Sequence, residues 1–314
     1  MRRDRRLRPP KQRHPPRRGE PDAPPSLIEL ERFDQASLHQ WLSAKSHLDA
    51  VQRALYFELE PLRQTRGPAL LDALRSAALA SYQFEGWGRI LDYRYGMEPL
   101  SAAGSLKGIG GRFNIGADLS PGSFTAFPVL YIAEDYQTAF AERFGIAVDG
   151  KIGALTALEI VLRAPSSFVH VRLRGLVENV IDVGDLESLK PTAGILREFT
   201  MPKVVLQTAR KLGLRQAPWL IRSPLTLQRQ LLHPNWRMVP QQFDLPSNSQ
   251  IFGRLALAAG LHGIVYTSTK SDGRRCLALF PQNWAGGGSF IEVTDAVPEG
   301  AKLTRLDGNT SSAV

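Results

Sequence analysis

The hydrophobic pattern of this 314-residue chain changes near residue 87, and this change constrains the fold more than any other feature. Between Asp34 and Tyr82, apolar residues recur at three- and four-residue steps, which is the spacing of helices. We expect one helix capped by Asp34 and a second helix over Pro68–Tyr82. From Trp87 onward, short β-rich stretches alternate with glycines, turns and further helices. The pattern predicts an α+β fold, with a small mixed or partly antiparallel sheet flanked by helices and a helical N-terminal extension.

Individual elements can be predicted after residue 87. Asp135 is expected to cap a helix that ends near Phe144, and Ser247–Gly260 is expected to be a helix stopped by glycine. The predicted strands are Arg89–Tyr95, Val129–Ala133, Leu155–Leu162, Phe168–Leu173, Gly263–Tyr266 and Arg275–Phe280. A glycine-rich loop is expected over Gly104–Gly116, and only helical pieces can be assigned between Ile181 and Asp244.

Composition divides the chain into four parts. We expect a disordered basic tail, a helical extension, one α+β domain interrupted by an insertion, and a C-terminal tail. Their boundaries are 1–25, 26–86, 87–300 with the insertion at about 146–246, and 301–314.

The net charge of +9 belongs almost entirely to the first 18 residues, which hold nine Arg or Lys and one Asp. The rest of the chain holds 30 basic and 29 acidic residues, so it is nearly neutral. The Arg- and Pro-rich tail has little apolar surface to bury, and we expect it to be disordered. It can attract nucleic acid or an anionic surface weakly, or serve only as a solubilising tail. The neutral remainder makes a nucleic-acid-binding function the weaker alternative.

The sequence lacks the signatures of several classes of protein. No apolar run approaches the ~20 residues of a membrane-spanning helix, and no apolar stretch follows the N-terminus as in a secretory signal. The single cysteine, Cys276, excludes an internal disulfide and fits a cytoplasmic protein. The histidines are scattered, so no metal site is predicted. The glycine motifs of Rossmann and P-loop nucleotide sites are absent.

Polar residues that could carry chemistry gather in three stretches. The first joins Tyr93-Arg94-Tyr95 to the glycine-rich loop, where Arg112 follows two glycines; arginine forks suit phosphate oxygens. In the second, Tyr131 lies on the buried strand, and Glu142 lies on the following helix. Thr138 and Glu142 are four residues apart and share one helix face. The third stretch offers two serines, one at a helix start and one after a strand.

These stretches together resemble the RES domain family. The resemblance rests on Arg94-Tyr95, Gly110-Gly111-Arg112-Phe113-Asn114, Leu130-Tyr131-Ile132-Ala133, Ala139 and Glu142. It covers residues 88–145 well and 247–283 moderately. It implies a fold like that of ADP-ribosyltransferase toxins. It also implies an enzyme that consumes NAD, by hydrolysis or phosphorolysis of the nicotinamide–ribose bond or by ADP-ribosylation of a protein. The resemblance further implies a toxin paired with an Xre-type antitoxin.

Carried over residue by residue, the resemblance assigns Arg94, Arg112, Tyr131 and Glu142 to catalysis. The family's serine matches either Ser247, which is slightly favoured, or Ser268. NAD would be bound by Arg94, Tyr95, Arg112, Tyr131 and Ser268. Two alternatives remain: an inactive module that binds NAD or ADP-ribose, and a nucleic-acid-binding protein that acts through its tail. The acceptor of the reaction, the oligomeric state and the role of residues 181–246 are not fixed by the sequence.

Overall fold

The computed structural model describes residues 35–145, 151–152, 155–156, 168–211 and 220–310. The basic tail 1–25, the cap Asp34, residues 157–162 of one predicted strand and residues 311–314 lie outside these ranges. The chain divides into two compact units, residues 1–47 and 48–314. The architecture below is that of the second unit, to which only residues 48–65 of the first helix belong.

Five strands pair in a closed ring. They are β1 (Leu79–Asp92), β2 (Leu130–Ala133), β5 (Phe168–Asp182), β6 (Gly263–Thr267) and β7 (Arg275–Leu279). The order is β1-β2-β7-β6-β5, and β5 pairs with β1 again. Only β5–β6 is parallel among these pairs. The predicted α+β class is therefore correct, but the sheet is a closed barrel and not simply a layer flanked by helices.

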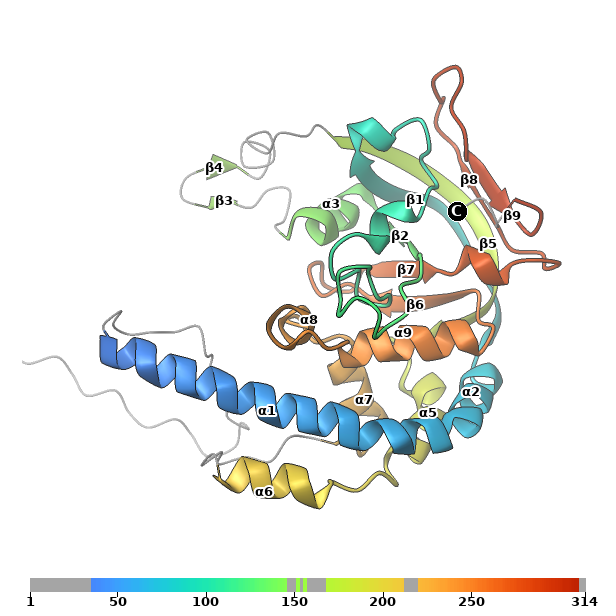
Figure 1. Ribbon diagram of the computed structural model, residues 1–314. Coiled ribbons are helices and arrows are strands. Elements are labelled where there is room, and N and C mark those ends of the chain that lie inside the picture. Colours follow the sequence, from blue (N-terminus) through green and yellow to red (C-terminus); the bar gives the residue numbers. More distant parts are fainter. Residues whose placement is uncertain (1–34, 146–150, 153–154, 157–167, 212–219, 311–314) are drawn as a thin grey trace, which may run out of the picture. The chain divides into compact units, whose positions relative to one another are not determined.

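Two further strands extend the sheet beyond β5, and helices pack beside it (Figure 1). The added strands are β8 (Phe290–Val293) and β9 (Arg305–Asp307), and a separate hairpin joins β3 (Lys151–Ile152) to β4 (Leu155–Thr156). The helices are α1 (Gln35–Thr65), α2 (Gly67–Ser76), α3 (Tyr136–Phe144), α5 (Leu186–Leu196), α6 (Lys203–Lys211), α7 (Pro224–Leu231), α8 (Met238–Phe243) and α9 (Asn248–Ala258). Within the described ranges, no helix combines the length and apolar character needed to span a bilayer.

The first strand corrects two predictions. The second helix ends at Ser76 and not at Tyr82, because β1 begins at Leu79 and pairs with β5 from Leu79↔Val180 onward. The strand predicted over Arg89–Tyr95 ends at Asp92, and the three residues that follow form a short 3-10 helix. A distant partner strand decided both boundaries, since local apolar spacing in this region fits either helix or strand.

The elements whose sequence signals are local lie where the sequence predicts them. Asp135 caps α3 by accepting a hydrogen bond from the amide of Thr138, and Gly145 ends the helix with a φ of 78°. Ser247 caps α9. The strands β2, β6 and β7 lie within a residue of their predicted ranges.

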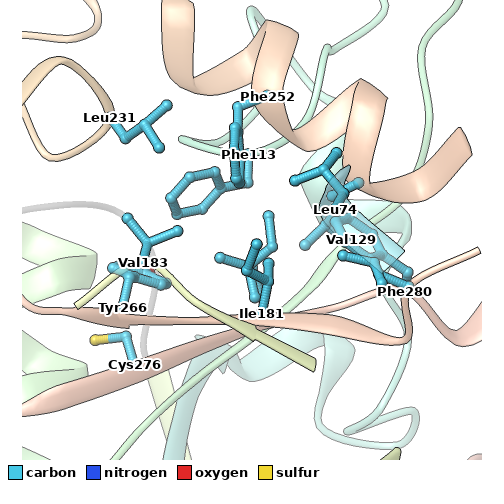
Figure 2. Packing of buried hydrophobic residues seen from close by; sticks show 14 of the residues in the cluster. Leu74, Phe113, Val129, Ile181, Val183, Leu231, Phe252, Tyr266, Cys276 and Phe280 are labelled. Carbon is cyan, nitrogen blue, oxygen red and sulfur yellow. The ribbon is translucent and has the colours of Figure 1, made fainter. Parts of the chain in front are cut away.

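The strands β2, β6 and β7 are buried on both faces, and alternate residues of β7 belong to different clusters. In β7, Cys276 and Ala278 pack in one cluster, whereas Leu277 and Leu279 pack in the other. Figure 2 shows the first cluster, where Phe113 of the glycine-rich loop packs near Phe252 of α9. Burial on both faces explains why β2, β6 and β7 are nearly continuous apolar runs in the sequence, whereas β1 and β5 contain exposed polar residues.

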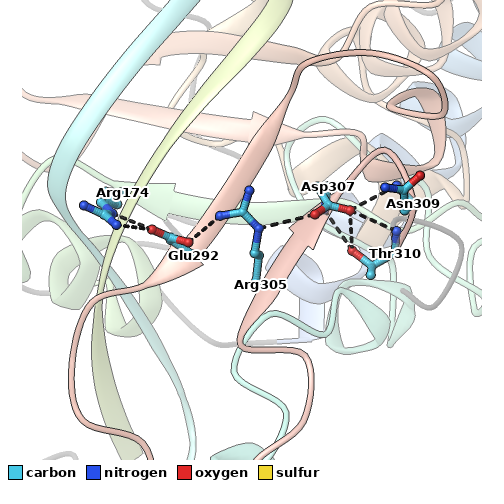
Figure 3. A network of polar contacts seen from close by, with 6 residues as sticks. All are labelled: Arg174, Glu292, Arg305, Asp307, Asn309 and Thr310. Atoms are coloured by element: carbon cyan, nitrogen blue, oxygen red, sulfur yellow. Dashed lines mark hydrogen bonds and ion pairs between the residues drawn. The ribbon is translucent and has the colours of Figure 1, made fainter.

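The β8–β9 hairpin is joined to β5 by backbone pairing and by a chain of ion pairs (Figure 3). Glu292 lies between Arg174 and Arg305, and Arg305 also contacts Asp307. These two arginines lower the pKa of the Glu292 carboxyl. These ion pairs lie on the protein surface, where such interactions stabilise a fold only slightly.

The close contact between α9 and the glycine-rich loop gives a stability prediction. A Cβ at Gly253 would lie 1.9 Å from the carbonyl oxygen of Phe113, so Gly253→Ala forces the loop and the helix apart. We expect the free energy of unfolding to fall by about 1–3 kcal/mol, measured by urea denaturation.

The matched control is Gly194→Ala on α5, where the added methyl group meets no atom within 4 Å. This change should leave stability equal or raise it by about 0.5 kcal/mol, since alanine favours a helix. Similar losses in both variants would contradict the packing described here.

Candidate active site

The glycine-rich loop is held in place by the side chain of Gln250, on the first turn of α9. Its amide nitrogen donates to the carbonyl oxygens of Ile109 (2.8 Å), Asn114 (3.0 Å) and Gly111 (3.3 Å). Gln250 is fully buried, and its amide oxygen accepts from the backbone of Ser247 in a capping box. The helix cap and the loop are therefore one connected structure.

Asn114 and Tyr131 fix the loop from the other side. The side-chain oxygen of Asn114 accepts from the Gly111 amide (2.8 Å) and from the Tyr131 hydroxyl (2.9 Å). The same hydroxyl accepts from the amide of Phe113 (2.9 Å). Burial raises the pKa of Tyr131, so its hydroxyl stays protonated. Since the hydroxyl is used by the loop, only the half-buried ring is left to contact a ligand.

Gly111 is required by this arrangement. A Cβ there would lie 2.6 Å from the Tyr131 hydroxyl oxygen, too close for any other residue without movement of the ring. The glycines before Arg112 thus bring the loop backbone directly against Tyr131.

Arg112 is buried, with 6% of its surface exposed, and its guanidinium binds segments far apart in the chain. It donates to the carbonyl oxygens of Leu231 (3.2 Å) and His233 (3.0 Å) and to the Thr269 hydroxyl (2.8 Å). Three of its five N–H donors are thereby used. Within the described residues it forms no ion pair with a carboxylate, and burial lowers its pKa. A buried cation without an anionic partner is suited to receive an anion.

Glu142 and Ser268 meet near this cation. The Ser268 hydroxyl donates to a carboxylate oxygen of Glu142 at 2.7 Å, and it accepts from the amides of Lys270 and Ser271. The Glu142 carboxylate is close enough to oppose the lowering of the Arg112 pKa. One turn earlier on α3, the Thr138 hydroxyl is buried with no hydrogen-bond partner among the described residues.

Arg94 and Tyr95 lie in the short 3-10 helix after β1. The Arg94 side chain is 67% exposed, stacks on Tyr95 at 4.8 Å from the ring centroid, and lies 3.5 Å from a carboxylate oxygen of Asp92. The Tyr95 hydroxyl accepts from Lys107, which lowers the tyrosine pKa. Asp92 also pairs with Arg143 on α3 at 2.5 Å, so Arg94 is linked to the helix that carries Glu142.

Four of the predicted residues therefore lie in one region: Arg112, Tyr131, Glu142 and Ser268. Arg112 binds Thr269, which follows Ser268 in the chain, and the charges of Glu142 and Tyr131 act on Arg112. Arg94 and Tyr95 are connected only through Asp92 and Arg143. Ser247, the slightly favoured serine, is 4% exposed, and its hydroxyl contacts Ser249 and Gln250 in the cap. Within the described part of the chain, no hydrogen bond joins Ser247 to Glu142.

Sequence reasoning missed several side chains that complete this region: Asn114, Trp236, Arg237, Gln250 and Thr269. Asn114 lies in the glycine-rich motif and Gln250 in the predicted helix Ser247–Gly260. Their side-chain amides were the feature by which the sequence could have identified them. Trp236 and Arg237 lie in the segment 181–246, where no sequence motif marks them. In the described part of the chain, no group of three or more His, Cys, Asp or Glu is placed to bind a metal ion.

Comparison with known proteins gives a family match. The profile described as "RES domain" matches residues 87–298. No curated protein matches the chain. Among solved structures, a chain of the M. tuberculosis MbcT-MbcA toxin-antitoxin complex is similar, with 15% identity and a TM-score of 0.40. The match covers 78% of this chain and 96% of that one, but at this score it supports no further conclusion.

Cys276, on β7 beneath this site, predicts how stability depends on pH. Burial, and then the negative charge of Glu142, raise the pKa of its thiol. The unfolded chain releases this proton above about pH 8.5, whereas the folded chain keeps it. The contribution of this thiol to the free energy of unfolding is therefore fully present below that pH. It declines as pH rises, by at most about 1.4 kcal/mol per pH unit.

Urea unfolding of the protein and of Cys276→Ala between pH 7 and 10 tests this. The variant loses some stability at pH 7 because of the cavity, but its decline above pH 8.5 should be shallower. Equal slopes would mean that the thiol ionises as readily in the folded protein as in the unfolded chain.

Proposed function

Because the chain belongs to the RES domain family, we propose that it is an enzyme that cleaves the nicotinamide–ribose bond of NAD. We further propose that it is the toxin of a pair whose partner is an Xre-type antitoxin. The observation that carries the proposal is the contact of Glu142 with Ser268 near the buried guanidinium of Arg112, which forms no ion pair within the described residues. This combination offers a cation for the phosphates and a carboxylate for the sugar of one dinucleotide.

Cleavage of the nicotinamide–ribose bond does not need an acid catalyst. Nicotinamide leaves as a neutral molecule from a cationic ring, so no group has to protonate it. The transition state carries positive charge at the anomeric carbon, as in glycoside cleavage. The enzyme has to orient the ribose and stabilise that charge.

Glu142 is the group proposed to stabilise that charge, as an ionised carboxylate that also accepts a hydrogen bond from a ribose hydroxyl. The Ser268 hydroxyl supports this role, since it holds one carboxylate oxygen at 2.7 Å while its own oxygen accepts two backbone amides. Ser268 is therefore preferred to Ser247 as the functional serine. The ring of Tyr131 packs against nicotinamide or ribose, with its hydroxyl reserved for the loop.

Arg112 is proposed to bind the pyrophosphate with the two donors that the protein does not use. Arg94 and Tyr95 are exposed enough to contact another part of the dinucleotide, and Asp92 keeps Arg94 near α3. The acceptor is water, phosphate or a protein side chain, and the NAD assay below distinguishes them.

The first test is the loss of NAD over time with purified protein, with and without inorganic phosphate. We expect Glu142→Gln to lower kcat by about 100-fold or more, because the amide cannot stabilise a developing cation. The Kd for NAD should change by less than about threefold. Glu58→Gln, at an exposed position on α1, is the matched control and should behave as the unchanged protein.

Each outcome has a definite meaning. Phosphate-dependent loss identifies phosphorolysis, and phosphate-independent loss identifies hydrolysis. Binding of NAD without any loss, also with cell extract as a source of protein acceptors, would contradict an active enzyme and leave a binding module. Equal losses of turnover and binding in Glu142→Gln would remove the assigned role of Glu142.

The two serines give a separate prediction. Ser268→Ala should lower kcat about tenfold, because the carboxylate of Glu142 loses the hydroxyl that orients it. Ser247→Ala should keep kcat within about twofold but lower the free energy of unfolding by about 1 kcal/mol, because it removes a helix cap. NAD turnover and urea denaturation of both variants test this, and a larger loss of kcat in Ser247→Ala would reverse the assignment.

A further inference from the structure

The indole ring of Trp236 contacts two guanidinium groups, those of Arg112 and Arg237. It lies between α7 and α8 and is buried, with 4% of its surface exposed. The guanidinium carbon of Arg112 is 5.9 Å from the ring centroid, and that of Arg237 is 4.7 Å away. The ring therefore holds Arg237 beside the buried cation of the site by a cation–π contact.

Arg237 differs from Arg112 in what its donors do. Arg112 is buried and uses three N–H groups on protein oxygens. Arg237 is exposed, and among the described residues its guanidinium makes no hydrogen bond and no ion pair. All five of its donors are thus available in a group whose position is already restricted by the indole.

The charges around this pair are unbalanced. The positive charge of Arg237 lowers the pKa of Arg112 further, and both arginines act on Tyr131. Burial, and then the charge of Arg112, lower the pKa of His233, whose carbonyl Arg112 binds. The nearby carboxylate, Glu142, is already bonded to Ser268. Among the described residues, Glu142 and Arg237 are the charged side chains that act on Arg112, so two guanidinium groups share one carboxylate, which favours a ligand that brings negative charge.

We propose that Arg237, held on Trp236, is a phosphate-binding residue that makes the site select a dinucleotide over a nucleoside. The inference rests on the proposed function. The pyrophosphate of a dinucleotide carries a negative charge on each of two phosphates. Arg112 binds one phosphate inside the site, and the planar fork of Arg237 binds the other at its exposed side. The insertion at about 146–246 thereby contributes to substrate binding.

The experiment compares two substrates that share the cleaved bond. NAD carries the pyrophosphate, whereas nicotinamide riboside has no phosphate. For Arg237→Ala we expect the KM for NAD to rise about tenfold with kcat within about twofold, because a charge-assisted hydrogen bond to the ground state is lost. The kcat/KM for nicotinamide riboside should be unchanged. Arg237→Lys should recover part of the loss, since it restores charge without the fork.

The matched control is Arg229→Ala on α7, an exposed arginine of the same insertion that has no ring or carboxylate contact within the described residues. It should leave both substrates unaffected. An unchanged KM for NAD in Arg237→Ala would overturn the inference, and so would an equal loss on nicotinamide riboside, which would indicate a merely structural role. Either result would leave NAD cleavage itself intact.

Calorimetric titration with ADP-ribose separates the inference from the proposed function. If the unchanged protein cleaves no NAD but binds ADP-ribose, a roughly tenfold weaker Kd in Arg237→Ala, with a shallower dependence on salt, still supports the phosphate site. Equal Kd values in the two proteins, or no binding of ADP-ribose by either, would overturn it.

Discussion

The buried guanidinium of Arg112 is the interaction on which the candidate site depends. Removing a cation from water costs several kcal/mol unless polar groups replace the lost hydration. Here the replacements are carbonyls from the end of α7 and the segment after it, and a hydroxyl from the loop after β6. No carboxylate forms an ion pair with Arg112 in the described residues, so Glu142 nearby offsets the charge only in part. The site is therefore organised around a charge that a phosphate can satisfy, as the proposed function requires.

The fold presents this cation by fixing the loop that carries it. Gln250 binds three carbonyls of the loop, Asn114 and Tyr131 bind its amides, and Gly253 lets α9 approach the Phe113 carbonyl. Each contact uses a buried polar group whose partner is backbone, which is a rigid arrangement once complete. The same contacts explain why Tyr131 is assigned a packing role and not an acid–base role. Its single O–H donor is used on Asn114, and its raised pKa keeps the hydroxyl protonated.

Residues 181–246 had no functional interpretation from sequence, yet this segment supplies two carbonyls to Arg112 and the indole that stacks on it. These contributions come from backbone oxygens and from a single aromatic ring, neither of which leaves a recognisable motif. The extra segment is thus part of the wall of the candidate site. In our proposal it also determines which substrates bind there.

The sequence by itself determined the elements whose signals are local. The cap at Asp135, the end of α3 near Phe144, the helix after Ser247 and the apolar strands β2, β6 and β7 all depend on residues within a few positions of each other. It also brought out the motifs by which the chain resembles the RES domain family. Only the tertiary structure decided that β1 begins at Leu79, that β1 and β5 close the ring, and that Ser268 rather than Ser247 contacts Glu142. The reason is physical: each of these depends on a partner many residues away, and a hydrogen bond between distant residues leaves no periodicity in either segment.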